Sequence, residues 1–261
     1  MQLLNLICNR YEKYNFLFEE LVKRDFKKRY KGTFLGILWS MLGPLLHLLV
    51  MVLVFNHFFG QAIPHFVIHV FAGIKMFTFF KESTSQGMTS IVGNSGIFTK
   101  IKVPKYLFLL SKNVAALLNF GLMLVIFFLF VLFDGVQITP RFLLLIYPVI
   151  TLMIFNIGVG LILSALFVFF KDVQYLYDIF TLLVMWMSAI FFSIDTFSLT
   201  VQRLFLLNPI FTHIHYFRLV TLHGLTPAWH IHLLCALYAI GALAVGAYFY
   251  KKYNYRFIYY M

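Results

Sequence analysis

The longest uncharged stretch of this chain begins directly after its densest group of basic residues. No Asp, Glu, Lys or Arg occurs between Gly32 and Ile74, whereas six of the nine residues 23–31 are Lys or Arg. Ionised side chains are costly in hydrocarbon, and Lys and Arg are retained on the cytoplasmic side of a bilayer during insertion. The junction therefore predicts a membrane protein whose first span starts at the cytoplasmic surface.

The composition supports this class. Hydrophobic residues make up 62% of the 261 residues and charged residues 11%, whereas roughly a quarter of a soluble domain is charged. A helix needs about 20 apolar residues to span a bilayer. We expect an all-α polytopic membrane protein in which residues 34–250 form the transmembrane domain, residues 1–33 precede it and residues 251–261 form a tail. Six spans are expected near residues 34–58, 68–90, 107–133, 142–169, 174–194 and 228–250.

One further apolar segment does not fit a seventh span. Residues 196–225 are interrupted by Asn208-Pro209, and a proline inside a helix removes a hydrogen bond and clashes with the preceding turn. We therefore expect two short re-entrant helices in this segment. The fifth span is also weak, because only residues 179–194 of it are free of charge.

The distribution of charge predicts the orientation. With six spans, 16 of the 21 Lys and Arg fall in segments on the side of the two termini, so both termini should be cytoplasmic. This asymmetry and anionic membrane lipids account for the net charge of +12 without a nucleic-acid partner. We expect no cleaved signal peptide, with the first span as a signal anchor, and no disulfide between Cys8 and Cys235.

The N-terminal segment is typical of an amphipathic helix at a membrane surface. Its apolar side chains recur at spacings of three and four, with Lys and Arg between them. A passive topological anchor explains the same pattern equally well. The apolar positions are Tyr11, Tyr14, Phe18, Leu21, Val22 and Phe26.

Two cytoplasmic connections are candidates for contact with a partner. Residues 83–104, between the second and third spans, are small, polar and rich in glycine. They lack the Gly-x-x-x-x-Gly-Lys-Ser/Thr pattern of a phosphate-binding loop, as does the rest of the chain, so no nucleotide site is expected. The turn at residues 170–174 joins the fourth and fifth spans, and its Lys171-Asp172 pair is most simply a solvated turn.

Ionisable residues inside the second span are a further candidate. Lys75 and Glu82 are seven residues apart and so share a helix face, and intramembrane charges tend to face a bundle interior or a wet cavity. We expect Glu82 in the interior. For Lys75 the interior and a snorkelling position at the outer headgroups remain equally open.

Aromatic and histidine residues leave more than one interpretation. Trp39, Trp186 and Trp229 suit either stacking on sugar rings or an interfacial aromatic belt. Eight of the nine histidines fall on the expected outer side, but no Cys or acidic ligand accompanies them at metal-site spacing, so we expect no metal. These are His57, His65, His69, His213, His215, His223, His230 and His232.

Residues 24–39, RDFKKRYKGTFLGILW, followed by Pro44-Leu45, resemble the opening of the permeases of type-2 ABC exporters for bacterial polysaccharides. The resemblance continues through residues 86–104, 170–173 and 207–210. It implies a homodimer with six spans per subunit in a bacterial inner or plasma membrane. It also implies two copies of a separate cytoplasmic ATPase, which bind the ATP and Mg²⁺, so that this chain needs no cofactor.

The resemblance also assigns roles to residues. The connections would contact the ATPase through Ile91, Gly93, Ile97, Phe98, Lys100, Lys171 and Asp172. A lipid diphosphate would be captured by Arg24, Lys27, Lys28 and Arg29, because cations attract it. The first and fifth spans of the two subunits would line a central path, and Trp39, Lys75, Glu82 and Trp186 would belong to the translocation path. Asn208 and Pro209 would belong to the outer exit gate.

The function predicted in this way is outward transport of a lipid-diphosphate-linked glycan, whether O-antigen, capsule or teichoic acid. A type-2 ABC exporter for a drug, lipid or peptide is the close alternative. A membrane-embedded glycan or lipid transferase is disfavoured, because the nine acidic residues form no Asp-x-x-Asp pair and no clear acid and base couple. We therefore expect no catalytic residue in this chain.

Overall fold

The computed structural model describes residues 2–28, 36, 38–59, 63–98, 100 and 103–260. Helices joined by short connections make up this part of the chain, and it contains no β-strand. The α-helices are α1 Gln2–Lys28, α2 Leu38–Phe59, α3 Phe66–Thr89, α4 Ser95–Phe98, α5 Tyr106–Phe133, α6 Ile146–Phe169, α7 Val173–Trp186, α8 Leu199–Phe205, α9 Pro209–Thr221 and α10 Trp229–Tyr253. Three 3₁₀ helices are η1 Val92–Asn94, η2 Pro140–Leu145 and η3 Arg256–Tyr259.

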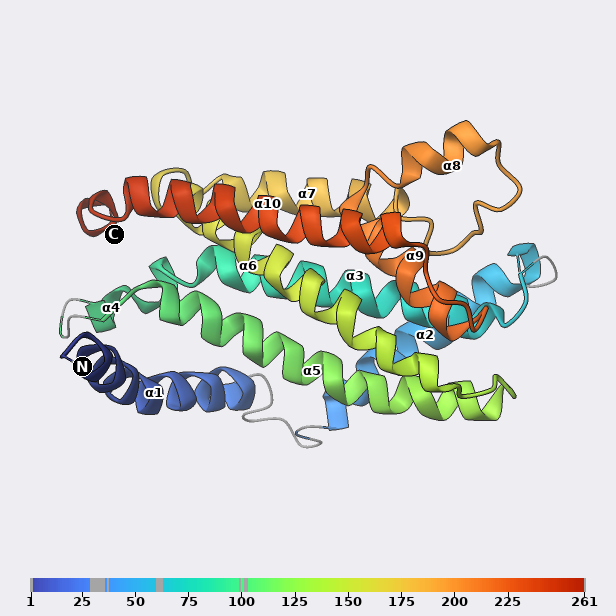
Figure 1. Cartoon of the computed structure of the whole chain (residues 1–261), viewed down its shortest axis with the longest axis horizontal. Coiled ribbons are helices and arrows are strands. Elements are labelled where there is room, and N and C mark those ends of the chain that lie inside the picture. The colour runs from blue at the N-terminus through green and yellow to red at the C-terminus, as the bar shows by residue number, and fades with distance from the viewer. Residues whose placement is uncertain are drawn as a thin grey trace.

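The long helices α3, α5, α6 and α10 run along the long axis of the molecule (Figure 1). Helix α6 packs most extensively against α10 and also against α3, which in turn packs against α5. The start of α1, helix α4 and the C-terminal segment lie at one end of this bundle, called here the termini end. Helices α8 and α9 lie toward the opposite end, called here the α8–α9 end.

Two glycines allow α6 and α10 to approach closely. A Cβ atom on Gly158 of α6 would overlap the backbone of Ala242, and one on Gly246 of α10 would overlap the carbonyl group of Gly158. Small residues at helix crossings bring backbones together and are the usual means of tight helix packing in membranes. The largest interface between helices in this subunit therefore depends on the absence of side chains at both positions.

Three segments of the described chain are long and apolar enough to cross a membrane: α5, η2 with α6 (Pro140–Phe169), and α10. They match three of the predicted spans. Helix α3 also matches its predicted range but carries His69 and three charged residues, Lys75, Lys81 and Glu82. Helix α7 differs from the prediction, because it has 14 residues and ends at Trp186 instead of near residue 194. At 1.5 Å per residue it is about 21 Å long, shorter than the ~30 Å hydrocarbon core.

A buried arginine from α9 explains why the chain leaves the helix after α7. The guanidinium group of Arg218 donates to the carbonyl oxygens of Ala189 and Ile190, at 2.8 Å each, and of His69 in α3, at 2.9 Å. The bonds to Ala189 and Ile190 satisfy carbonyl groups that a continuing α7 would have paired internally, and the bond to His69 ties this segment to α3. Gly73 of α3 leaves the space, since a Cβ atom there would lie 2.7 Å from Nη2 of Arg218.

The break at Asn208-Pro209 has a local cause. Asn208 caps α9 by accepting a hydrogen bond from the amide of Ile210 (3.0 Å), and Pro209 occupies the first helical position, where its missing N–H is not needed. The Asn208 amide also donates to Met187 O (3.2 Å) and Ser188 Oγ (3.0 Å), after α7. Two short helices, α8 and α9, are present where the sequence predicted them.

Candidate functional site

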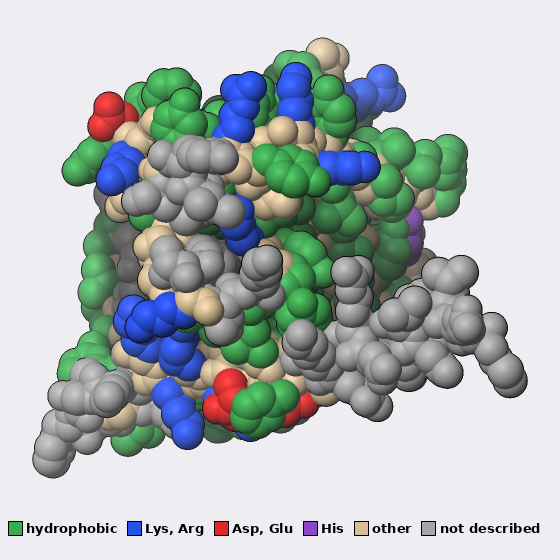
Figure 2. Space-filling view, turned by 90° about the vertical axis from the view of Figure 1, so that its left-hand side faces the viewer, with side chains coloured by type: hydrophobic (Ala, Val, Ile, Leu, Met, Phe, Trp, Pro, Cys, Tyr) green, Lys and Arg blue, Asp and Glu red, His purple; other side chains and the backbone are tan. Residues whose placement is uncertain are grey.

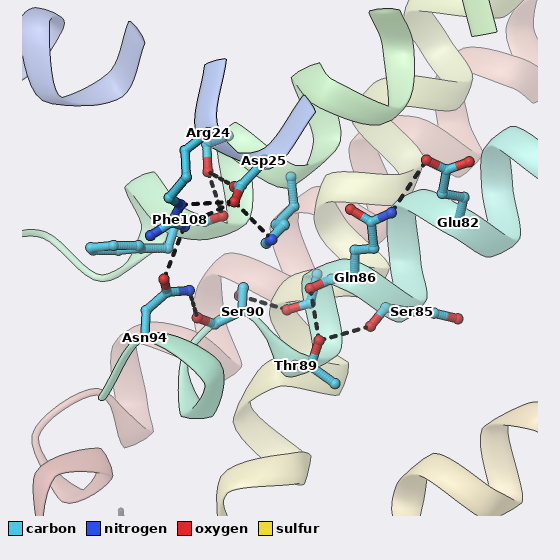
Figure 3. A network of polar contacts seen from close by, with 12 residues as sticks. Arg24, Asp25, Glu82, Ser85, Gln86, Thr89, Ser90, Asn94 and Phe108 are labelled. Carbon is cyan, nitrogen blue, oxygen red and sulfur yellow. Dashed lines mark hydrogen bonds and ion pairs between the residues drawn. The ribbon is translucent and has the colours of Figure 1, made fainter. Parts of the chain in front are cut away.

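The most completely built polar site at the termini end surrounds Asp25 of α1 (Figure 3). Its side chain is 1% exposed. The carboxylate accepts hydrogen bonds from Arg24 Nη2 (2.9 Å), from Lys112 Nζ (2.9 Å) and from Ser111 Oγ (3.0 Å). Ser111 and Lys112 belong to α5, so the buried carboxylate fixes α1 to α5. A buried carboxylate is stable only when it is paired and hydrogen-bonded in this way.

Arg24 extends this site to the connection that follows α3. Its Nη2 atom donates to Asn94 Oδ1 at 3.0 Å, and the Asn94 amide donates to Ser90 O at 2.7 Å (Figure 3). Asn94 lies in η1, directly before α4. We call Arg24, Asp25, Asn94, Ser111 and Lys112 the Asp25 cluster. It joins α1, α5 and the η1–α4 connection into one hydrogen-bonded unit.

A second polar group lies in the last two turns of α3. Glu82 accepts hydrogen bonds from Asn119 of α5 (2.9 Å) and from Gln86 (3.2 Å). Thr84 accepts one from Tyr177 of α7 at 2.5 Å. In this way α3 presents polar side chains to both α5 and α7, and intramembrane polar groups of this kind act as links between helices.

The C-terminal tail also packs at this end. Lys105 Nζ donates to Asn254 O (3.0 Å) and lies 5.4 Å from the centroid of the Phe257 ring. Partial burial of Lys105 lowers the pKa of its ammonium group, because desolvation disfavours the charged form. Phe257 is fully buried in a small apolar cluster that includes Ile91. The tail therefore holds the segment that enters η1.

Exposed basic side chains dominate the face at the termini end. Figure 2 shows Lys and Arg groups distributed over this face, with few acidic groups among them. A positive face favours contact with anionic lipid headgroups or other anions. Exposed basic residues in the described segments of this end are Lys23, Arg24, Lys27, Lys28, Lys100, Lys171, Lys251, Lys252 and Arg256.

Comparison with known proteins decides the family. A family model described as ABC-2 type transporter matches residues 17–222, which include the whole Asp25 cluster. The chain belongs to the ABC-2 type transporter family. This confirms the resemblance found in the sequence, and the matched region extends from the second half of α1 to the end of α9.

Two curated relatives of this ABC-2 type protein are both called O-antigen export system permease protein RfbA. The one from Myxococcus xanthus is 33% identical over 151 residues, which is 58% of this chain and 57% of the relative. One from Klebsiella pneumoniae is 31% identical over 126 residues, which is 46% of this chain and 49% of the relative. The chain thus spans about half the length of the curated relatives that it matches.

The residues predicted to contact an ATPase lie at the termini end of this ABC-2 type subunit. The η1–α4 connection and the turn between α6 and α7 are both at that end (Figure 1). Their exposure differs. Ile91 is fully buried and serves as an anchor, and Ile97 is half-buried. Exposed positions are Gly93, Lys100, Lys171 and Asp172, and the side chain of Phe98 lies outside the described residues.

The residues predicted to capture a diphosphate divide into two kinds. Lys27 and Lys28 at the end of α1 are exposed, as capture requires. Arg24 is engaged by Asp25 and Asn94, so part of its role is structural. Arg29 lies outside the described residues.

The residues predicted to line a path do not converge within one subunit. Trp39 on α2 and Trp186 on α7 are about half exposed, at 47% and 52%. Lys75 is buried, with its Nζ atom 5.3 Å from the centroid of the Phe71 ring, and Glu82 takes part in the polar group with Asn119.

The Asp25 cluster is the feature that sequence reasoning did not identify. Asp25 stands as one acid within a run of bases, which was interpreted as a topological signal and as a site of diphosphate capture. Asn94 was interpreted as one polar residue of a glycine-rich connection. The single acidic residue inside a basic run was a usable signal, because an acid there has cationic partners close by in any fold.

Several histidines lie around a cavity at the α8–α9 end. In the described part of the chain no group of three or more His, Cys, Asp or Glu side chains is placed to hold a metal ion. Four histidines, His65, His69, His215 and His223, line a cavity of about 270 Å³. His232 instead accepts or donates a hydrogen bond with the Tyr216 hydroxyl at 2.9 Å.

Proposed function

We propose that this chain is the transmembrane subunit of an ATP-driven exporter that moves a lipid-diphosphate-linked polysaccharide outward across a bacterial inner membrane. The observation that carries the proposal is membership of the ABC-2 type transporter family together with relatives named as O-antigen export permeases from two organisms. O-antigen is therefore the first choice among the polysaccharides that the sequence left open.

The proposed topology has six spans with both termini in the cytoplasm. Besides the three long apolar segments, α2, α3 and α7 would cross the membrane, the last of them continued by residues 187–194. Its support is that both ends of the chain lie at one end of the bundle (Figure 1), where exposed Lys and Arg gather (Figure 2). Basic residues are retained on the cytoplasmic side. Helix α1 would lie in the headgroup layer, and α8 and α9 would re-enter from outside.

A separate ATPase would supply the energy. Two copies of it, holding ATP and Mg²⁺, would dock at the termini end against the η1–α4 connection and the Lys171-Asp172 turn. Movement of the connection would then reach α1 through the Arg24–Asn94 hydrogen bond and α5 through Asp25. The Asp25 cluster is thus proposed to carry the motion of the ATPase into the membrane domain.

A homodimer would provide the path. Helices α2 and α7 expose large apolar and aromatic side chains to the outside of the single subunit, which is typical of surfaces covered by lipid or by another copy. With α2 and α7 of two subunits facing a central path, Trp39 and Trp186 would offer ring faces to sugars. Lys27 and Lys28 would attract the diphosphate at the cytoplasmic surface.

Site-specific cross-linking tests the proposed docking surface. In a background with Cys8→Ser and Cys235→Ala, we expect Ile97→Cys, labelled with a benzophenone maleimide, to photo-cross-link to the co-expressed cognate ATPase. Phe133→Cys should give no such product, because position 133 is the last residue of α5, away from the termini end, although its side chain is 88% exposed. Cross-linking from position 133 with none from position 97 would contradict the proposed docking.

A further inference from the structure

The cavity at the α8–α9 end is formed by four parts of the chain. His65 and His69 come from the start of α3, and residues 189–195 come from the segment after α7. Helix α9 and the following loop complete the wall. Its volume of about 270 Å³ lies near the lower end of the roughly 300–1,000 Å³ of small-molecule pockets. It therefore suits a single small ring rather than an extended chain.

Aromatic rings line part of the cavity, where Phe211 is 2% exposed and His215 is half-buried. The rings of Phe211 and His215, one turn apart on α9, stack with centroids 5.5 Å apart and an interplanar angle of 16°. Phe192 adds a third ring to the lining. Aromatic faces carry partial negative charge and attract the C–H edges of a saturated ring. Such a wall favours a ring with an apolar face.

Polar groups in the lining of the cavity can form hydrogen bonds with a ligand. One carboxylate oxygen of Asp195 accepts from Ser193 Oγ at 2.5 Å, while its other oxygen has no partner among the described residues. The ring nitrogens of His215 and His223 likewise make no hydrogen bond within the described chain. A carboxylate only accepts, and a neutral imidazole both donates and accepts. Together these groups match hydroxyls, which do both.

The same lining disfavours other ligand classes. Arg218, the cation in the wall, directs its Nε, Nη1 and Nη2 groups to backbone carbonyls, and the carboxylate of Asp195 repels anions. A hydrocarbon chain would leave Asp195, His215 and His223 without partners, which costs free energy. A neutral polyhydroxylated ring satisfies the aromatic wall and the polar groups at once.

We propose that this cavity is a sugar-binding site that holds one neutral sugar residue, stacked on His215 and hydrogen-bonded by Asp195 and His223. On the proposed function, it would hold a unit of the glycan as the chain emerges on the outer side. Its place at the end opposite to the basic face puts it where an exported polymer would leave (Figure 1).

Saturation-transfer NMR on the full chain in lipid nanodiscs, prepared without glycoside detergents, tests the site. The probes are the methyl glycosides of glucose, galactose, mannose, rhamnose and N-acetylglucosamine. At least one should bind with a dissociation constant on the order of 1 mM, the range expected for a ligand of this size. Asp195→Asn should weaken that binding about tenfold, through loss of a charged hydrogen-bond acceptor.

Variants of the wall separate stacking from folding. His215→Leu should weaken binding roughly threefold or more, whereas His215→Phe should retain most of it, because the flat ring remains. His230→Leu, on an exposed histidine that does not line the cavity, should bind as the unchanged protein does. Size-exclusion chromatography should show the same folded species for all four variants.

Three results would overturn the site: no glycoside binds, inorganic phosphate displaces the glycoside, or Asp195→Asn binds as tightly as the unchanged protein. The proposed function is tested separately, by measuring the exported polysaccharide on the surface of cells. Glycoside binding without export would support this site and refute the exporter, whereas export without glycoside binding would refute this site alone.

Discussion

Replacing Gly246 by leucine will leave little folded subunit, because the new side chain has no space between α10 and α6. Even its Cβ atom would overlap the carbonyl group of Gly158, so the two helices must separate along their whole interface. Inserting bulk into a packed core lowers the free energy of unfolding by about 1–3 kcal/mol. A substitution that forces two helix backbones apart should belong to the rare class that costs more than ~4 kcal/mol. Fluorescence-detected size-exclusion chromatography should show a loss of the monodisperse peak and a strongly lowered melting temperature.

Gly241 supplies the matched control on the same helix. It is exposed, and a Cβ atom there meets nothing within 4 Å, so Gly241→Leu should fold and elute normally. The control thus makes the same glycine-to-leucine substitution on α10, five positions before Gly246. Equal behaviour of the two variants would mean that α6 and α10 do not pack through these glycines.

Replacing Asp25 by alanine will break the connection between α1, α5 and the η1–α4 segment. The change leaves Lys112 and Arg24 without their carboxylate and removes one of the two acceptors of the Ser111 hydroxyl, the other being Phe108 O. Removing one partner of a fully buried ion pair typically costs about 3–5 kcal/mol. The cost here should be smaller, because the side chains of Lys112 and Arg24 are 17% and 40% exposed and water can solvate part of their charge. We expect a clear loss of thermal stability and, with the cognate ATPase, loss of export. Asp25→Asn should lose less, because it keeps one acceptor oxygen.

An exposed pair on the same helix is the control for Asp25. Lys23 and Glu20 form a salt bridge of 2.9 Å in which both side chains are about half exposed. Surface pairs contribute little, so Glu20→Ala should leave stability and export unchanged. If Asp25→Ala matched Glu20→Ala in melting temperature and export, the cluster would have neither the structural nor the coupling role.

The sequence predicted those elements that depend on local signals. Uncharged apolar runs identified α5, α6 and α10, and Asn208-Pro209 identified the start of α9 through a cap and a proline that act within one turn. The end of α7 has no such signal. It depends on Arg218, about 30 residues further on, which binds the carbonyl groups after Trp186. No pattern around residue 187 could have revealed it.

The candidate site divides in the same way. That Lys27 and Lys28 would be exposed follows from their charge, whereas the burial of Asp25 follows from the packing of α1 against α5, 86 residues later. The sequence grouped the histidines by their position along the chain. Which of them share a cavity depends on how α3, α9 and two loops meet, and this is tertiary information that periodicity does not contain.

The central claim is that this chain and a separate ATPase move a lipid-linked polysaccharide across a membrane. Its most direct test is a proteoliposome assay in which this chain is reconstituted with the cognate ATPase facing outward and a lipid-diphosphate-linked O-antigen in the bilayer. We predict that ATP makes the glycan inaccessible to an added glycan-cleaving enzyme, and that this protection disappears when the ATPase is omitted. Absence of ATP-dependent protection with both proteins present, or equal protection without the ATPase, would contradict the account.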